Sequence, residues 1–187
     1  MKKLIIFALS LALFGCNNLR DYEPVTFTVS DDTLIMNGVI DSNVKSKLQK
    51  ALNASPKITS IVMENVEGSV DDEANLEAAR LVRNHKLNTV IPSNGLVASG
   101  GTDFFLSGTN RTAQKGAKIG VHSWAGEGIE DPVKLPRNHI EHQKYLRYYK
   151  EMGIPDEFYW YTLESAPSND MHWMTSSEIK KYNITTE

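Results

Sequence analysis

The stretch Gly95–Trp124 reads Gly-Leu-Val-Ala-Ser-Gly-Gly-Thr-Asp-Phe-Phe-Leu-Ser-Gly-Thr-Asn-Arg-Thr-Ala-Gln-Lys-Gly-Ala-Lys-Ile-Gly-Val-His-Ser-Trp. It places Ser99 in a turn of small residues that leads into an apolar run, and it brings His122 to the end of a short strand pattern. A serine hydroxyl is a poor nucleophile at neutral pH, so it needs an imidazole within hydrogen-bond reach and backbone N–H groups aimed at the developing oxyanion. The stretch therefore predicts half of a nucleophilic site, with Ser99 as the nucleophile and His122 as the general base.

The start of the chain has the parts of a secretory signal: two lysines, an apolar core of about a dozen residues and a small residue before the break. This core is too short for a spanning helix, which needs roughly twenty apolar residues. Its ending, Leu13-Phe14-Gly15-Cys16, resembles the lipobox of bacterial lipoproteins, in which cleavage leaves the cysteine as a lipidated N-terminus. Cys16 is the single cysteine of the chain, so it cannot form an internal disulfide.

We therefore expect residues 1–15 to be a lipoprotein signal peptide and Cys16 to carry the lipid, the alternative being a plain signal peptide with an incidental cysteine. By the habit of that family, Asn17 beside the cysteine favours sorting to the outer membrane. The expected location is the bacterial cell envelope, with the protein anchored by its lipid and facing the periplasm. We assign residues 16–30 to the lipidated cysteine and a tether, and residues 31–187 to one folded domain.

The size and charge of the chain limit its functions. About 170 residues remain after the signal, which suits one domain with a single core. The formal net charge is −3 at pH 7. Because the sequence has no basic stripe, nucleic acid is not expected as a partner.

Hydrophobic patterns predict an α/β domain. Strand patterns lie at 25–29, 33–40, 58–63 and 89–92. Three helices are expected: the first is capped by Asp41 or Ser42, the second begins at Asp71, and the third follows the turn at the start of 98–106. This alternation predicts a largely parallel sheet with crossover helices. Further helices are expected over 138–152, from Asp156 and over 176–182, with a short strand at 171–174. Ligands bind in loops at the carboxyl ends of parallel strands, where both Gly68 and Ser99 are expected.

Several segments, in the same order, resemble the proteolytic subunits of Clp proteases. They are the early strand Ile35–Asp41, the oxyanion loop Glu67-Gly68-Ser69-Val70, the nucleophile turn Ala98-Ser99-Gly100-Gly101, the later Gly108, and the strand end Val121-His122. The resemblance covers about Leu34 to the C-terminus and is closest to uncharacterised periplasmic ClpP-like proteins of bacteria. It implies a ClpP/crotonase-like fold: a largely parallel twisted sheet with crossover helices and a helical C-terminal part.

The resemblance also implies a catalytic site. Ser99 would be the nucleophile, His122 the base, and the backbone N–H groups of Gly68 and Gly100 the oxyanion hole. Glu67 stands where the family has a glycine. The acid that orients the histidine would be Asp170, and the alternatives for this position are Ser168, Asn169 and Glu164.

These features predict an envelope lipoprotein with a serine hydrolase domain of peptidase type, acting on peptide or other acyl substrates without a cofactor or metal. The alternative is a catalytically inactive ClpP-like binding or scaffold lipoprotein, in which Ser99 only makes a tight turn and His122 is a core residue. A crotonase-type acyl-CoA enzyme is a third reading, which fares worse because the inferred compartment lacks coenzyme A. Domains of this family form trimers or rings, so the resemblance implies a homo-oligomer.

Three further clusters are candidates for a site. His139 and His142 flank Glu141 on one side of a predicted helix, and a hydrogen-bonded helix face is favoured there over a metal site. The aromatic run 158–161 is read as core packing of an amphipathic helix rather than as a peptide-binding surface. The acidic run 71–73 is read as a helix start, because acidic side chains favour the first turn of a helix.

Overall fold

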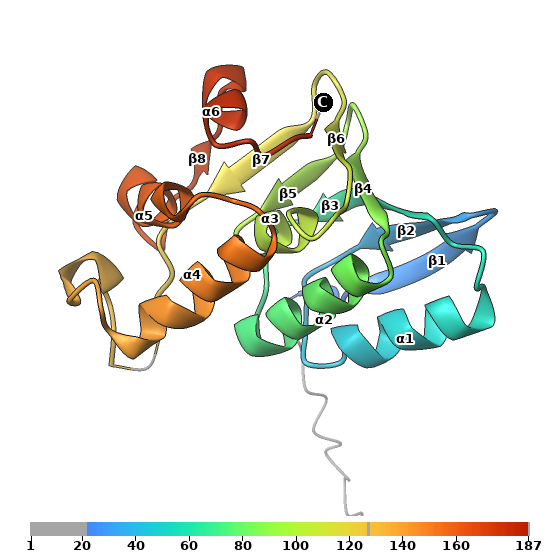
Figure 1. Ribbon diagram of the computed structural model, residues 1–187, viewed down its shortest axis with the longest axis horizontal. Coiled ribbons are helices and arrows are strands. Elements are labelled where there is room, and N and C mark those ends of the chain that lie inside the picture. The colour runs from blue at the N-terminus through green and yellow to red at the C-terminus, as the bar shows by residue number, and fades with distance from the viewer. Residues whose placement is uncertain (1–21, 127, 187) are drawn as a thin grey trace, which may run out of the picture.

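The computed structural model describes residues 22–126 and 128–186 (Figure 1). The expected signal peptide and Cys16 lie outside the described residues. The described chain forms one branched sheet with helices packed on it, and Figure 1 shows α1 and α2 running beside each other next to the strands of the N-terminal half. No helix in the described ranges has both the length and the apolar character needed to cross a bilayer.

The sheet has eight strands: β1 (Thr26–Ser30), β2 (Thr33–Asn37), β3 (Ser60–Val66), β4 (Asn88–Ile91), β5 (Leu96–Ala98), β6 (Arg111–Ala113), β7 (Lys118–Val121) and β8 (His172–Trp173). At two edges of the sheet, β1 pairs antiparallel with β2 and β8 pairs antiparallel with β7. All other strand pairs are parallel. The prediction of a largely parallel sheet is therefore confirmed.

The sheet branches at β3. The first half of β3, residues 60–62, pairs with β4, and its second half, residues 65–66, pairs with β5. One branch continues from β4 to β6, and the other continues from β5 to β7 and β8. The carboxyl ends of β3, β5 and β7 thus meet at one edge of the second branch, and these ends carry the Gly68 loop, Ser99 and His122.

The helices are α1 (Val44–Ala54), α2 (Asp72–Asn84), α3 (Gly100–Phe105), the short 3-10 helix Pro132–Lys134, α4 (Ile140–Glu151), α5 (Asp156–Ser165) and α6 (Ser176–Lys181). Asp71 caps α2 through a bond from the Ala74 N–H, and a capping box joins Thr175 and Glu178 at the start of α6. At α1 the predicted cap is wrong: Asn43 occupies the cap position without a side-chain bond. The Asp41 carboxylate instead accepts from the Asn43 N–H.

The folded domain begins before the boundary expected at residue 31. Residues 26–30, which we assigned to the tether, form β1 and pair with β2 along its whole length. Val25 is fully buried in the core. The short strands β5 and β6 were not expected either, because three-residue strands are too brief to show a period of two.

The C-terminal helices complete the core. Phe158 and Tyr159 of α5 are buried, as are Tyr148 and Tyr149 of α4. The core-packing interpretation of the aromatic run 158–161 is confirmed for these two buried members, and the run does not form an exposed apolar surface. Gly153 ends α4 with a φ of 72°, the left-handed conformation that glycine adopts without strain.

Candidate active site

Ser99 lies at the sharp junction between β5 and α3, with φ 52° and ψ −127°. Such a backbone is strained for a residue with a side chain, and this kind of strain clusters at functional sites. The turn is held on both sides: the Ser99 N–H donates to the Gly120 carbonyl at 3.1 Å, and the Ser99 carbonyl accepts from the Thr102 N–H at 2.9 Å. Strand-to-helix turns of this kind present a serine hydroxyl to the end of a sheet.

Two glycines allow the start of α3 to approach the end of β3 closely. A Cβ on Gly101 would lie 2.0 Å from the Val66 carbonyl oxygen, and one on Gly100 would lie 2.4 Å from the Ser69 Cβ. Asn75 adds a bond from its side-chain amide to the Gly100 carbonyl at 2.8 Å. No side chain fits at either glycine, so the sequence Ser-Gly-Gly is what lets the nucleophile turn contact the neighbouring loop.

This contact places Gly68 beside Ser99. A Cβ built on Gly68 would lie 3.6 Å from the Ser99 Cβ and 3.9 Å from its Oγ. Among the hydrogen bonds of residues 22–126 and 128–186, none uses the N–H of Gly68 or of Gly100. Gly100 is the first residue of α3, where backbone N–H groups have no partner within the helix. Two backbone donors therefore lie next to the serine and are unoccupied within the described chain.

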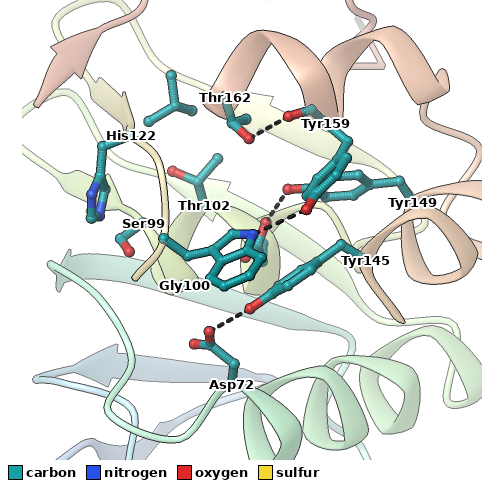
Figure 2. A pocket seen from close by; sticks show the side chains of 12 residues that line it. Asp72, Ser99, Gly100, Thr102, His122, Tyr145, Tyr149, Tyr159 and Thr162 are labelled. Carbon is teal, nitrogen blue, oxygen red and sulfur yellow. Dashed lines mark hydrogen bonds between the residues drawn. The ribbon is translucent and has the colours of Figure 1, made fainter. Parts of the chain in front are cut away.

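His122 follows the last residue of β7 and lines the same cavity as Ser99 (Figure 2). Its burial lowers the pKa of the imidazole below the usual 6.5, and this is opposed by the backbone of Ser123, by the charge of Asp72 and by the backbone of Ser168. The ring is therefore neutral at neutral pH and able to accept a proton. The structure brings together Ser99, His122, Gly68 and Gly100, as the sequence led us to expect.

Asp170 does not join them. Its side chain is exposed, it is not among the residues that line the cavity, and its carboxylate accepts from the Met171 N–H at 2.7 Å. The Asp170 N–H closes a surface turn by donating to the Pro167 carbonyl, and in this turn the carboxylate makes its bond to Met171 rather than to His122. The side chains considered as alternatives are also exposed: Glu164, Ser168 and Asn169. Within the described chain the buried Nδ1 of His122 has no hydrogen-bond partner.

The far side of the cavity holds residues that the sequence did not lead us to expect. Figure 2 shows Asp72 from the start of α2 facing Tyr145 from α4, whose hydroxyl donates to the Asp72 Oδ2 at 2.6 Å. The Tyr149 hydroxyl donates in the same way to the Oδ1 of Asp103 at 2.6 Å. Asp103 is one helical turn beyond Ser99, where it interrupts an otherwise apolar segment, and this interruption was the available signal.

The cavity raises the pKa of Asp103 to about 7. Burial is the largest cause, the hydrogen bond from Tyr149 opposes it, and the nearby negative charge of Asp72 adds to it. A carboxyl with a raised pKa in a cleft beside a serine and a histidine makes this cavity the candidate functional site of the described chain.

Metal binding finds no support in the described residues, where no group of three histidine, cysteine, aspartate or glutamate side chains is placed to hold an ion. His142 is fully buried, and its Nδ1 lies 2.6 Å from the hydroxyl of Tyr159. The interpretation of the segment 139–142 as a hydrogen-bonded helix face is therefore correct for His142.

No protein-family model matches the sequence, and no curated protein matches it. Solved structures do resemble it. ClpP1 from Listeria monocytogenes, in a variant form, has a TM-score of 0.56 at 20% identity, with 83% of this chain and 90% of that chain covered. A variant of the 1510-N membrane-bound stomatin-specific protease in complex with a substrate peptide has a TM-score of 0.52 at 14% identity, with coverage of 79% and 71%.

An enoyl-CoA hydratase from Polaromonas has a TM-score of 0.50 at 13% identity, with 87% of this chain and 69% of that chain covered. Identities this low show the fold alone. The described chain has the ClpP/crotonase fold, and its structural neighbours include peptidases.

Proposed function

We propose that this chain is a lipid-anchored envelope protein whose domain is a serine hydrolase of peptidase type. The observation that carries the proposal is the placement of Ser99: it sits on a strained strand-to-helix turn, shares a cavity with a neutral His122, and lies beside the free N–H groups of Gly68 and Gly100. The names of two structural neighbours, a ClpP and a stomatin-specific protease, support a peptide as the substrate.

The chemistry uses these groups in sequence. His122 takes the hydroxyl proton of Ser99 as the Oγ bonds to the carbonyl carbon, and the carbonyl oxygen becomes an oxyanion that accepts hydrogen bonds from the Gly68 and Gly100 N–H groups. His122 then gives the proton to the leaving group, whose bond to the carbonyl carbon breaks. A water molecule, deprotonated by the same imidazole, then attacks the acyl carbon. The bond from that carbon to the Ser99 Oγ breaks, and the imidazolium returns the proton to the Oγ.

Asp72 has a role in this scheme that Asp170 does not fill. Its negative charge lies close enough to His122 to favour the protonated ring. The imidazolium that forms during attack is thus stabilised through space by an aspartate, although no carboxylate of the described chain bonds to Nδ1. We expect a slower enzyme than one with a complete triad, since the ring lacks a hydrogen bond that fixes its tautomer.

Labelling with a fluorophosphonate tests the proposal. The folded wild-type protein is expected to be modified and Ser99→Ala to be unmodified. Ser93→Ala is the matched control, because Ser93 is an exposed serine before β5, at the other end of that strand from Ser99. Absence of label from folded wild-type protein would remove the hydrolase assignment.

The competing function is an inactive binding or scaffold protein that keeps the fold. The unpartnered Nδ1 of His122 is the observation that favours it. The same labelling experiment distinguishes the two functions, because a scaffold protein would bind ligand in the cavity but would not react with the fluorophosphonate.

The anchor is tested apart from the chemistry. Mass spectrometry of the mature protein is expected to find a diacylglyceryl group on Cys16 as the first residue. An unmodified Cys16 retained within a longer chain would refute lipidation and leave the hydrolase proposal standing.

A further inference from the structure

The cavity beside Ser99 has an unusual distribution of hydrogen-bond donors. Its tyrosine hydroxyls give their protons to the carboxylates, Tyr145 to Asp72 and Tyr149 to Asp103. The threonine hydroxyls that line the cavity give theirs to backbone carbonyls, Thr162 to Tyr159 and Thr102 to Gly120.

The remaining donors of the lining are also used. The Trp124 Nε1–H donates to the Tyr159 hydroxyl oxygen at 3.0 Å, and that hydroxyl lies 2.6 Å from the His142 Nδ1. Because an indole N–H can only donate, the Tyr159 oxygen accepts from Trp124, and a second hydrogen bond joins this hydroxyl to the His142 Nδ1. Apart from the reacting Ser99 and His122, the polar side chains of this cavity are therefore already hydrogen-bonded, and the carboxylate oxygens of Asp72 and Asp103 are its strongest acceptors.

The strongest of these acceptors are two carboxylates without a cation. Asp72 and Asp103 each use one oxygen for a tyrosine hydroxyl, and within residues 22–126 and 128–186 no lysine, arginine or histidine nitrogen forms an ion pair with either. The repulsion between them contributes to the raised pKa of Asp103. A bound cation would relieve this repulsion and favour the ionised form of Asp103.

The walls of the cavity also suit a cation. The Tyr145 ring stacks on Trp124 with centroids 6.0 Å apart and on Tyr159 with centroids 5.6 Å apart. Figure 2 shows Tyr145, Tyr149 and Tyr159 gathered on the side of the cavity opposite His122. These packed rings form an apolar wall, and the attraction between a carboxylate and a cation is stronger beside such a wall than in water.

The space selects the shape of the cation. The cavity has a volume of about 40 Å³, room for about three water-sized groups. The end of a lysine side chain, two methylenes and an ammonium, has this size, whereas the flat guanidinium of arginine is wider. An ammonium also carries three donors and no acceptor, which matches the carboxylate acceptors of the lining.

We infer that the cavity binds a primary ammonium group, and that the substrate carries a lysine-like side chain next to the acyl group attacked by Ser99. The second half of this inference rests on the proposed hydrolase function, whereas the binding of the ammonium does not.

Binding is measured on Ser99→Ala, so that catalysis plays no part. Nα-acetyl-lysine methylamide is titrated against its uncharged isostere, Nα-acetyl-norleucine methylamide, with the fluorescence of the tryptophans as the readout. We expect the lysine compound to bind at least tenfold more tightly. Equal affinity for the two compounds, or equal affinity for the arginine analogue, would overturn the inference.

Charge-removing variants locate the binding group. Asp103→Asn and Asp72→Asn keep the oxygen that each tyrosine needs, and each is expected to abolish most of the preference for lysine. Glu73→Gln is the matched control, because Glu73 lies in the same first turn of α2 but lines a different groove. A preference that survives both aspartate variants, or falls equally in Glu73→Gln, would contradict the assignment to this cavity.

Hydrolysis then tests the placement at the scissile group. In wild-type protein, the thiobenzyl ester of Nα-protected lysine is expected to show kcat/KM at least tenfold above that of the norleucine ester. Tight binding of the lysine compound with no hydrolysis of either ester, and no fluorophosphonate label, would refute the hydrolase function and leave the ammonium site standing. Labelling of Ser99 without a preference for lysine would support the hydrolase function and refute the ammonium site.

Discussion

The two sides of the cavity are built in opposite ways. On the side of Ser99 and His122, the Nδ1 of the histidine and the N–H groups of two glycines have no partner within the described residues. On the opposite side, every hydroxyl of the tyrosines is bonded, and the aromatic rings pack on one another. Groups left free are available to a substrate, and groups held by bonds stay in place while it binds.

We infer from this difference that the two sides of the cavity have different roles. The nucleophile side holds its backbone in a strained turn and keeps its polar atoms for the reacting carbonyl. The tyrosine side fixes two carboxylates so that they can recognise charge. Variants on the first side should therefore affect catalysis more than stability, and variants on the second side should affect stability and selectivity.

The largest effect is expected from removing the nucleophile. Ser99→Ala should lower kcat/KM for an activated ester by about a thousandfold or more, because neither the oxyanion hole nor the base acts without the hydroxyl. Thermal unfolding followed by circular dichroism should show little change, since the side chain makes no hydrogen bond in the described structure. Ser93→Ala should leave both measurements unchanged, and a comparable loss there would contradict the assignment of Ser99.

Asp103→Asn should stabilise the protein in a pH-dependent way. The folded pKa of Asp103 is raised to about 7 from 3.8, so the folded state holds a proton that the unfolded state has lost between these values. Wild-type stability contributed by this group therefore falls as pH rises from about 4 to about 7. From these two pKa values, the variant should gain about 4 kcal/mol at pH 8 and close to nothing at pH 4. Urea denaturation at the two pH values measures this, and a gain independent of pH would contradict it.

The next largest effects are expected from two glycine substitutions, one of which should affect stability and the other catalysis. Gly101→Ala would force a methyl group to within 2.0 Å of the Val66 carbonyl oxygen, and we expect it to cost about 3 kcal/mol of unfolding free energy. Gly68→Ala meets only ordinary contacts, 3.6 Å and 3.9 Å from the Ser99 side chain. It should leave urea denaturation unchanged and lower esterase activity about tenfold by crowding the oxyanion. Equal stability of the two variants would refute the packing of α3 on β3.

The smallest expected effect is a shift in the pKa of the general base, His122. Because the pKa of His122 is lowered, the acid limb of the pH–rate profile for a neutral ester should have its midpoint below 6.5. Asp72→Asn removes a charge that favours the imidazolium, so this midpoint should move to lower pH by roughly 0.5 units. A midpoint that does not move would show that Asp72 has no electrostatic contact with the base.

The nucleophile side could be predicted from the sequence because its chemistry is local. Ser-Gly-Gly after a strand and a histidine at a strand end are short patterns, and the parallel order of β3, β5 and β7 brings them to one edge. The alternation of strand and helix patterns predicted the largely parallel sheet, and the resemblance to Clp proteolytic subunits implied the ClpP/crotonase-like fold. The domain boundary expected at residue 31 was too late, because the strand pattern at 25–29 was assigned to the tether although it forms a hairpin with β2 across the two residues 31 and 32.

The tyrosine side could not be predicted, since it depends on how α4 and α5 pack across α2 and α3. Tyr145 and Tyr149 repeat at helical spacing and look like core positions, which they also are. Only their contact with Asp72 and Asp103, 73 and 46 residues away, gives them a second role. Asp170 failed for a different reason: no aspartate aligns with the family pattern, so the prediction rested on the nearest acid, whose exposed carboxylate accepts from the Met171 N–H rather than from His122.

The most direct test of the Ser99 site is a crystal structure of the wild-type protein after inactivation with a fluorophosphonate. We predict a covalent bond from phosphorus to the Ser99 Oγ, with the phosphoryl oxygen about 2.7–3.1 Å from the N–H groups of Gly68 and Gly100. The His122 ring should lie within hydrogen-bond reach of the adduct. An adduct on another residue, or a phosphoryl oxygen turned away from both glycines, would contradict the account of this site.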